Sequence, residues 1–515
     1  MWVCIVSKLH EWQAECLDIW VKNNFRGIVN AVTGSGKTVL ALSAISRLDE
    51  SIDLDLRIKI VVPQTFLAGQ WKEELKRFYG AKSSDIGLYH GARKDMGRKY
   101  MIYVINSARY SLARHILSEL DSGHAVLLIA DECHHYGSAE NKRIFDFIGV
   151  ADKDAPYFAL GLSATPEIVN FSDITTPLGP EIYYYGFEKA LRDNIISRFI
   201  LYSVRVEFSP HERRDYTDLS DSLTACMASL FKMKPELRGM TSARFFAYLQ
   251  RLSNQDSEAG NAARSALNIM YKRKTLCHMA QERPICAMAI VNALPAQTRI
   301  ILFCERIQSA EELYHSLSAQ YHKQVELYHS KMPDNTRQDV LQRYKHGSLR
   351  LLVCCRALDE GLNIPSTDAG IIVSTSTSAR QRVQRLGRML RLSKKVKQIF
   401  YLYVGESSED SELVFGLNTV ANAVPLITLR YLGGIFVHSE YERLREQVLE
   451  HVYNRRYDPK LLDALDQNLD RALLRGDFLL QESVCRDNFR TARYISERNY
   501  WASVLYIILA RLGRL

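Results

Sequence analysis

Ala31-Val32-Thr33-Gly34-Ser35-Gly36-Lys37-Thr38 is the stretch that decides the fold of the first part of this 515-residue chain. It matches the phosphate-binding loop pattern, with Ala31 where a glycine usually opens the loop. A strand-like apolar run, Gly27 to Val29, precedes it, and a helix-like run, Val39 to Ile45, follows it. In that setting glycines let backbone N–H groups surround phosphate oxygens, and the start of the helix adds partial positive charge. The alternative interpretation is a glycine-rich turn that holds no ligand.

The loop predicts a site for ATP and Mg²⁺. Lys37 is expected to reach the β- and γ-phosphates, and the Thr38 hydroxyl is expected to bind Mg²⁺. The other loop residues expected to contact the nucleotide are Thr33, Gly34, Ser35 and Gly36. Upstream, Gln13 lies in an amphipathic, helix-like run, and its amide can both donate and accept hydrogen bonds at an adenine edge. The alternative for Gln13 is an exposed polar position on a surface helix.

Short apolar runs alternate with helix-like runs after the loop. The strand-like runs span 57–63, 100–105, 125–130 and 157–162. This alternation predicts an α/β domain with a parallel sheet. Ligands of such sheets bind beyond the carboxyl ends of the strands, so the polar residues that follow each run are candidates for a site.

Two adjacent carboxylates, Asp131 and Glu132, follow the third of these runs. Their burial is costly unless they serve a cation or a reaction. With a phosphate loop upstream, Asp131 is expected to hold Mg²⁺ through water, and Glu132 to position and deprotonate the attacking water. His134 is interpreted as a relay to Ser163 and Thr165, because adjacent histidines, here His134 and its neighbour, rarely share one metal ion.

A second alternation of strand-like and helix-like runs spans 299–404 and has no phosphate loop of its own. Within it, Arg385, Arg388 and Arg391 are spaced by three and share one face of a helix. We expect Arg388 and Arg391 to complete the first domain's site as arginine fingers, since guanidinium groups offer planar, permanently charged donors to the developing charge. The alternative is a basic helix exposed to water.

Two further segments lack this alternation. Residues 209–295 look helical, and their basic and aromatic side chains suit a sugar-phosphate track. A solvated helical face fits them equally well, because acids such as Glu236 are mixed in. The basic residues are Arg213, Arg214, Lys232, Lys234, Arg238, Arg244, Arg251, Arg264, Lys272, Arg273, Lys274 and Arg283. The expected domains are 1–185, a second domain from 186–208 and 296–405, the helical insertion 209–295, and a helical C-terminal segment 406–515.

The composition narrows the class of protein. Hydrophobic residues make up 47% and charged residues 24%, as in ordinary globular proteins, and the net charge of +9 favours polyanionic partners. The longest apolar runs are too short to span a bilayer, and the first ten residues lack the apolar core of a signal peptide. The 10 cysteines form no CxxC pair, so we expect reduced thiols in a cytoplasmic protein without structural zinc.

From Leu9 to Val404 the chain resembles a superfamily 2 helicase or translocase of the DEAD/DEAH-like type. The motifs that carry the resemblance stand in the family's order: Gln13, Ala31 to Thr38 (motif I), Val62-Pro63-Gln64 with Gln70-Trp71 (Ia), Asn106-Ser107 (Ib), Asp131-Glu132-Cys133-His134 (II), Ser163-Ala164-Thr165 (III), Ile301-Leu302-Phe303 (IV), Leu358-Asp359-Glu360-Gly361 with Ile364-Pro365 (V), and Gln384-Arg385 with Gly387-Arg388 and Arg391 (VI). The Gln-Trp, Leu-Asp-Glu-Gly and Gln-Arg-Leu-Gly-Arg strings are most similar to the XPB-like branch of DNA helicases, and restriction or defence helicases share them.

The resemblance also implies residue roles. Asp359, Gly361 and Gln384 are expected to contact the nucleotide, and Gln64 and Ser107 to contact nucleic acid. The family usually has threonine where this chain has Gln64, so that contact is expected to be altered. Because the sequence begins only a few residues before the adenine-reading glutamine, an N-terminal damage-recognition domain is expected to be absent.

The fold that the resemblance implies is two tandem RecA-like parallel-sheet domains with a helical insertion and a helical C-terminal segment. The implied function is hydrolysis of ATP stimulated by nucleic acid, DNA rather than RNA, with domain closure converted into movement along the backbone. Two alternatives are the motor subunit of a restriction, defence or repair complex, and an ATP-gated clamp that does not unwind. A protein partner that supplies targeting or nuclease activity is expected, and no membrane. The expected location is the cytoplasm, at the nucleoid in a prokaryote.

Overall fold

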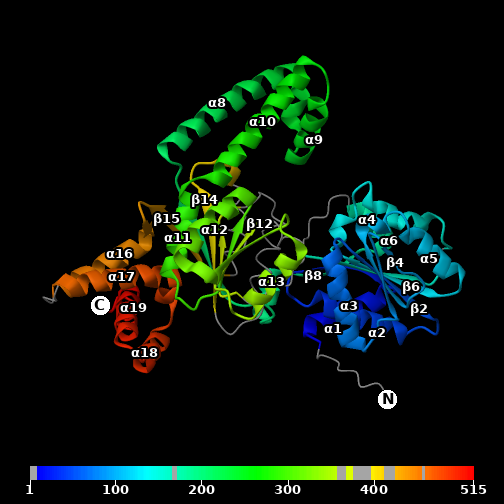
Figure 1. Cartoon of the computed structure of the whole chain (residues 1–515), viewed down its shortest axis with the longest axis horizontal. Helices are drawn as coiled ribbons and strands as arrows, with labels where there is room; N and C mark the ends of the chain where they lie inside the picture. Colours follow the sequence, from blue (N-terminus) through cyan, green and yellow to red (C-terminus); the bar gives the residue numbers. More distant parts are fainter. Residues whose placement is uncertain are drawn as a thin grey trace. The chain divides into compact units, whose positions relative to one another are not determined.

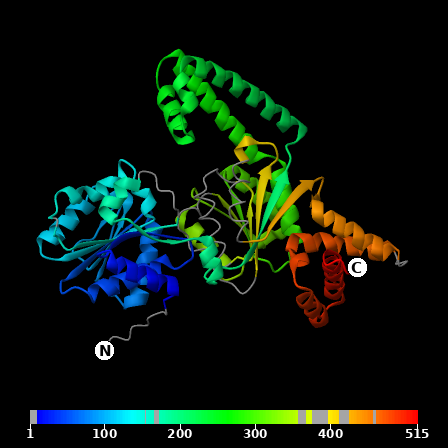
Figure 2. The same cartoon turned by 180° about the vertical axis from the view of Figure 1, so that it is seen from behind.

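The computed structural model describes residues 9–152, 154–164, 171–355, 367–374, 396–410, 424–454 and 459–515. Their contacts separate two compact units, of which the first runs to Arg198 and the second begins at Phe199 (Figure 1). Figure 2 shows the chain from behind. The contacts assign α7 (Phe187–Arg192) to the first unit, whereas the sequence-based boundary lies at residue 185. Among the described residues, no helix combines the length and apolar character needed to cross a membrane.

The first unit is built on an eight-stranded sheet with the order β4-β3-β5-β2-β6-β7-β1-β8. Its strands are β1 (Arg26–Ala31), β2 (Leu56–Val62), β3 (Ile86–His90), β4 (Arg93–Lys94), β5 (Tyr100–Val104), β6 (Ala125–Asp131), β7 (Tyr157–Ser163) and β8 (Glu181–Tyr185). Every neighbouring pair is parallel except β3 and β4, which form an antiparallel hairpin at one edge. The predicted strands form the middle of this sheet, and β3, β4 and β8 extend it beyond the prediction.

The helices of this unit are α1 (Glu11–Lys22), α2 (Lys37–Asp49), α3 (Thr65–Tyr79), α4 (Ile105–Ala108), α5 (Leu112–Asp121), α6 (Phe171–Leu178) and α7, with 3₁₀ segments η1 (Cys133–His135) and η2 (Asn141–Gly149). The apolar run of β6 is buried at every position from Ala125 to Ala130. Because side chains of a strand alternate between its two faces, both faces of the sheet are covered there.

The carboxyl ends of the parallel strands meet at one edge of the sheet. Ala31, Val62, Val104, Asp131 and Ser163 end β1, β2, β5, β6 and β7. The predicted motifs I, Ia, II and III begin at these positions and motif Ib begins two residues after Val104, so the topology gathers them at one edge, as expected for an open α/β sheet.

The second unit holds another eight-stranded sheet, with the order β11-β12-β10-β13-β14-β9-β15-β16. Its strands are β9 (Phe199–Val206), β10 (Ile300–Cys304), β11 (Val325–His329), β12 (Leu351–Cys355), β13 (Ala369–Ile372), β14 (Lys397–Val404), β15 (Leu426–Leu432) and β16 (Ile435–Val437). All pairs are parallel except β15 and β16. The expected class, α/β with two parallel-sheet domains, is confirmed.

The strands β15 and β16 correct the expectation that residues 406–515 are helical. From Ile427 to Tyr431, buried and exposed residues alternate strictly, which is the pattern of a strand with one covered face. Gly433 and Gly434 both have positive φ angles and close the hairpin. The segment therefore contributes two strands before its helices α16 (Ser439–Tyr453), α17 (Pro459–Arg475), α18 (Glu482–Thr491) and α19 (Ile495–Arg511).

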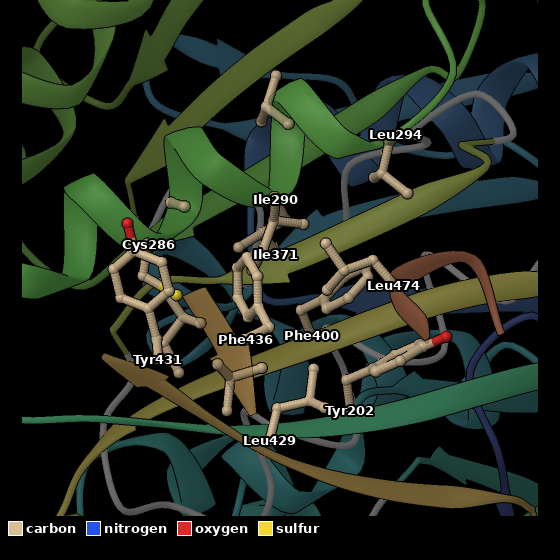
Figure 3. Close-up of a cluster of buried hydrophobic side chains, with 14 of the residues drawn as sticks. Tyr202, Cys286, Ile290, Leu294, Ile371, Phe400, Leu429, Tyr431, Phe436 and Leu474 are labelled. Carbon is tan, nitrogen blue, oxygen red and sulfur yellow. The ribbon is translucent and has the colours of Figure 1, made fainter. Parts of the chain in front are cut away.

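The main core of the second unit lies between this sheet and the helices packed on it, among them α11 (Glu282–Ala293). Figure 3 shows Cys286 and Ile290 of α11 lying over side chains of the central strands, among them Ile371 and Phe400. Among the described residues, α12 (Ile307–Tyr321) and α13 (Asp334–Lys345) also belong to this α/β domain. Although α11 falls inside the predicted insertion 209–295, its buried face makes it part of the α/β domain.

The rest of the insertion is a helical arm made of α8 (Pro210–Met233), η3 (Pro235–Gly239), α9 (Ser242–Ser253) and α10 (Glu258–Met279). In both views α8 and α10 run side by side away from the sheet of the second unit. The arm has a small core of its own that includes Leu230, Leu249 and Leu252. A capping box of Ser209 and Glu212 starts α8 directly after β9, which fixes where the arm leaves the sheet.

Candidate functional site

The phosphate loop connects the end of β1 to the start of α2. Gly34 and Gly36 have φ angles of 87° and 94°, in the left-handed region that favours glycine. A Cβ atom on Gly36 would also lie 2.8 Å from Nε2 of Gln13. Ala31, in contrast, is the last strand residue and pairs with Tyr185 of β8. The first glycine of the usual pattern is therefore replaceable here, because position 31 keeps ordinary strand geometry.

Two hydroxyl groups of the loop are buried and lack a partner. Neither Oγ1 of Thr33 nor Oγ of Ser35 has a hydrogen-bond partner among the described residues, and Ser35 is only 1% exposed. Buried hydroxyls without partners are rare in folded proteins and need a ligand or water. They lie just before the start of α2, where the helix dipole and free N–H groups favour an anion. The loop therefore fits a phosphate chain.

Lys37 begins α2, and its side chain turns back over the loop. Its Nζ donates a hydrogen bond to the carbonyl oxygen of Ala31 at 2.9 Å. Thr38, the next residue of the helix, is partly exposed. These two side chains lie at the end of the loop where the motif predicts the terminal phosphates of the nucleotide.

Gln13 lies against the loop rather than on an exposed helix face. It is 1% exposed, its Oε1 accepts a hydrogen bond from N of His10 at 2.9 Å, and its Nε2 donates to O of Gly36 at 3.0 Å. Burial contradicts the alternative of a solvated polar residue. One N–H of the amide already donates to the loop. A hydrogen bond to an adenine would therefore use the second N–H or the second lone pair of Oε1.

The carboxylate of Asp131 is held in place by its neighbours. Its Oδ2 accepts a hydrogen bond from the indole Nε1 of Trp71 at 2.9 Å, and its Oδ1 accepts from N of Glu132 at 3.1 Å. The hydroxyl of Tyr136 donates to O of Asp131 at 2.7 Å and to O of Val61 at 3.0 Å. Burial and the adjacent Glu132 carboxylate raise the pKa of Asp131 above its usual range. A nearby cation would reverse this effect.

Glu132 adopts an unusual backbone conformation, with φ 50° and ψ 48°. For a non-glycine residue this left-handed geometry costs about 1–2 kcal/mol, and such strain concentrates at functional sites. Its Oε2 is buried, has no hydrogen-bond partner among the described residues, and lies 3.5 Å from Nδ1 of His134. The same Nδ1 is 3.1 Å from Oγ of Ser163, at the end of β7. A path of polar atoms thus joins the candidate base to the end of the next strand.

Two side chains of this site were missed as partners by the sequence reading. In the sequence analysis, Trp71 is named only within motif Ia, and Tyr136 is not singled out. Both are buried, and buried tryptophan and tyrosine usually find a partner for their one polar hydrogen. That rule signals a partner, but only the fold identifies Asp131 as the group they support.

Several predicted site residues fall outside the described part of the chain. These are Thr165, Asp359, Gly361, Gln384, Arg388 and Arg391. Their assigned roles stay predictions. Of the predicted nucleic-acid contacts, Gln64 precedes the first turn of α3 and Ser107 lies in α4, both partly exposed. They follow β2 and β5, which are neighbours in the sheet, so the fold gathers them at the same edge.

The basic residues of the helical arm differ in their contacts. Two near its base form ion pairs: Arg213 with Glu207 and Glu406, both at 3.1 Å, and Arg273 with Glu409 at 3.3 Å. Others are exposed and available to a polyanion, among them Arg214, Lys232, Arg238, Arg251 and Lys272.

Arg283 is the most deeply buried of the paired arginines. It is 1% exposed, and it donates to the Asp410 carboxylate and to carbonyl oxygens of Cys277, Val373 and Leu402. Its guanidinium thus joins the turn between α10 and α11 to the ends of β13 and β14. Arg283 therefore has a structural role, although the sequence analysis places it among the basic residues that suit a sugar-phosphate track.

Comparison with known proteins agrees with this geometry. The family described as the Type III restriction enzyme, res subunit, matches residues 7–168, and the helicase conserved C-terminal domain matches residues 285–393. A DNA 3'-5' translocase XPB2 of Sulfurisphaera tokodaii is 27% identical, over 75% of this chain and 80% of that protein. A putative DNA 3'-5' helicase Rad25 of Haloarcula marismortui is 23% identical, over 78% of this chain and 54% of that protein.

Solved structures share the fold at low sequence identity. The helicase domain of Pyrococcus furiosus Hef matches with a TM-score of 0.50 and 15% identity, covering 80% of this chain and 99% of that one. The Type ISP restriction-modification enzyme LlaBIII bound to DNA matches with a TM-score of 0.52 and 14% identity, covering 98% of this chain and 40% of that one.

The phosphate loop, the acid pair and the two parallel sheets define an ATP-hydrolysing protein with tandem RecA-like domains. The chain belongs to superfamily 2, the DEAD/DEAH-like helicases and translocases, and its relatives are of the XPB-like and restriction types. Their names bear out the resemblance that the motifs predicted. The chain spans most of the XPB2 translocase, but about half of the two Rad25 relatives.

Proposed function

We propose that this protein is an ATP-driven translocase that moves along DNA and whose motor cycle is powered at the phosphate loop of its first unit. The observation that carries the proposal is the acid pair: Glu132 is held in a strained conformation, and its buried Oε2 has no hydrogen-bond partner among the described residues, one residue after a carboxylate fixed by Trp71. That arrangement stands at the same sheet edge as a loop with orphaned hydroxyls. It suits activation of a water molecule beside a bound phosphate chain.

The residues divide the chemistry among themselves. Lys37 neutralises charge on the terminal phosphates, and the orphaned loop hydroxyls and N–H groups hold the phosphate chain. Thr38 and Asp131 are the oxygen donors that would hold Mg²⁺, and the ion would offset the negative charge of the phosphate chain. Glu132 orients the attacking water and accepts its proton. The carboxylate of Glu132 contacts His134, and His134 contacts Ser163. These contacts link the group that activates water to the end of β7.

Conversion of hydrolysis into movement requires the second unit. Arg388 and Arg391 are proposed to contact the γ-phosphate when the two units close, and Gln384, Asp359 and Gly361 to line the nucleotide. Hydrolysis removes the γ-phosphate contact that favours the closed state, so the two units separate again. Repeated closure while both units hold one backbone gives steps along it.

DNA is the proposed track because the relatives matched over most of this chain are named DNA translocases and helicases. Gln64 and Ser107 are proposed to contact its backbone. Such contacts depend on phosphate charge, so the binding should be largely independent of base sequence and weaken as salt increases.

A second candidate is the motor subunit of a restriction-type assembly. The match to the family named for the res subunit of Type III restriction enzymes favours it, as does coverage of nearly this whole chain by 40% of LlaBIII. In that case a partner supplies nuclease or targeting activity, and movement by the isolated chain is weak.

ATP turnover with no polymer, single-stranded DNA, duplex DNA and RNA tests the proposal. Stimulation by DNA well above that by RNA supports a DNA motor, and a strand-separation assay then distinguishes an unwinding helicase from a duplex translocase. If no polymer changes the rate of ATP turnover, the isolated chain does not act as a nucleic-acid motor. A restriction-type subunit would then be tested by the same assay after addition of a candidate partner.

A further inference from the structure

An exposed tyrosine surrounded by arginines stands at the site edge of the first unit. Tyr110 follows α4 directly and is 61% exposed. The guanidinium carbons of Arg109 and Arg143 lie 5.9 Å and 5.8 Å from the centroid of its ring. A third arginine, Arg114, donates a hydrogen bond from Nη2 to O of Tyr110 at 3.1 Å. The cluster combines one aromatic ring and three cations.

The fold accounts for only part of this cluster. Arg109 is held by the side chains of Asn106 and Glu140, so its position serves the local structure. Arg143 has an exposed side chain, and the one contact described for it is with the Tyr110 ring. The ring itself contributes nothing to the core around Ala108. With Glu140 as the carboxylate in contact with the cluster, positive charge remains in excess.

The position of the cluster relates it to the predicted nucleic-acid contacts. Tyr110 stands three residues after Ser107, beyond the carboxyl end of β5. Arg143 lies in η2, which contacts both α4 and α5 and follows the acid pair in the chain. Segments that follow two different strands of the sheet therefore bring the ring and its cations together at the edge that carries the motifs.

We propose that Tyr110 is a stacking platform for one unpaired base of a bound nucleic-acid strand, and that Arg143 contacts an adjacent phosphate. The inference rests on the proposed function and sharpens it, because a base can stack on this ring only where the strand is single. Stacking on an exposed aromatic ring is tolerant of sequence, since every base has a π-face. The ring is 61% exposed, and the guanidinium groups lie near the 6 Å limit of a cation–π contact.

The test is equilibrium binding of labelled oligo(dT) to the full chain, with Tyr110→Ala, Tyr110→Phe and Tyr110→Trp compared with the unaltered protein. Alanine should weaken binding by about fivefold or more, as expected for loss of one stacked base, while phenylalanine and tryptophan should retain it. Tyr494, which is 68% exposed in the second unit, supplies the matched control Tyr494→Ala, expected to have no effect.

Two further arms separate stacking from charge. An abasic oligonucleotide of the same length should bind the Tyr110→Ala variant and the unaltered protein equally, because the partner of the ring is missing. Arg143→Gln should reduce the slope of log affinity against log salt by about one, as expected for one lost phosphate contact, with Tyr110→Ala leaving the slope unchanged. Oligo(U) in parallel distinguishes DNA from RNA as the strand.

Unchanged oligo(dT) binding by Tyr110→Ala would overturn the platform, and so would an equal loss on duplex, abasic and single-stranded substrates. Either result leaves the proposed motor intact if DNA still stimulates ATP turnover by the unaltered protein. Absence of that stimulation defeats the proposed function itself, so the two failures are distinguishable.

Discussion

The phosphate loop of the first unit and the base of the helical arm in the second are both polar regions, but they are built differently. The loop takes its shape from contiguous residues, two of them glycines with positive φ angles. At the arm's base, Arg283 and Arg273 meet carboxylates more than a hundred residues away in the sequence. Two buried hydroxyls of the loop have no hydrogen-bond partner among the described residues, whereas the charged side chains at the base of the arm bind one another.

This difference distinguishes a ligand-binding site from a structural contact between elements of the fold. Orphaned polar atoms at a strained, buried edge indicate a ligand, because an unsatisfied buried group destabilises the fold unless something binds it. Charges held in ion pairs between distant segments indicate that the surrounding elements are fixed in one arrangement. The first region therefore binds and reacts, and the second fixes how the arm leaves the sheet.

The largest effect is expected in the reaction itself. Lys37→Ala and Glu132→Gln should each reduce ATP turnover by about 100-fold or more, because one removes the phosphate-neutralising charge and the other removes the base. Steady-state phosphate release measures it. Lys142→Ala, an exposed lysine of the same unit, is the matched control. Near-normal turnover by Glu132→Gln would show that Glu132 is not the base.

The base of the arm should respond in stability. Arg283→Met leaves the Asp410 carboxylate buried and unpaired, so it should lower the free energy of unfolding of the second unit by about 3–5 kcal/mol. Arg213→Gln removes partly exposed ion pairs and should cost about 1 kcal/mol or less. Urea denaturation followed by a probe in the second unit compares them. Equal losses for the two variants would contradict the distinction between a buried tie and a surface pair.

Within the loop, Gly36→Ala should lower stability by about 1–2 kcal/mol and weaken nucleotide binding, since alanine is strained at this φ and its Cβ meets Gln13. Gly69 in α3 has open space around its Cβ position and no positive φ, so Gly69→Ala should be neutral or slightly stabilising. Thermal unfolding with and without ATP measures both. A neutral Gly36→Ala variant would mean that the loop does not require this conformation.

The smallest effect is expected in the pH profile. Trp71→Phe removes a hydrogen bond that favours the ionised form of Asp131, so the pKa of this carboxyl, already raised by burial and by Glu132, should rise further. Asp131 must be ionised to bind Mg²⁺, and activity is lost as pH falls through its pKa. The acid limb of kcat/KM for ATP should therefore move to higher pH, by about one unit. An unchanged limb would indicate that Asp131 does not control it.

The local character of the first region also explains why sequence reasoning located it. The loop, the acid pair and the strands before them are contiguous patterns, and the fold places Lys37, Asp131 and Ser163 at one sheet edge as the βα alternation predicts. Trp71 and Tyr136 illustrate the limit, because the partner of a buried polar hydrogen depends on the tertiary structure. The base of the arm shows the limit more fully. Arg213, Arg273 and Arg283 look like a nucleic-acid track until Glu406, Glu409 and Asp410, all distant in sequence, are placed beside them.

Displacement of a third strand from duplex DNA tests the central claim most directly, because a triplex is removed only by a motor that moves along the duplex. The unaltered chain should displace the strand in the presence of ATP, and Glu132→Gln should bind the same DNA but leave the strand in place. Displacement by Glu132→Gln equal to that of the unaltered chain, or none by the unaltered chain while duplex DNA stimulates its ATP turnover, would contradict translocation driven from this phosphate loop.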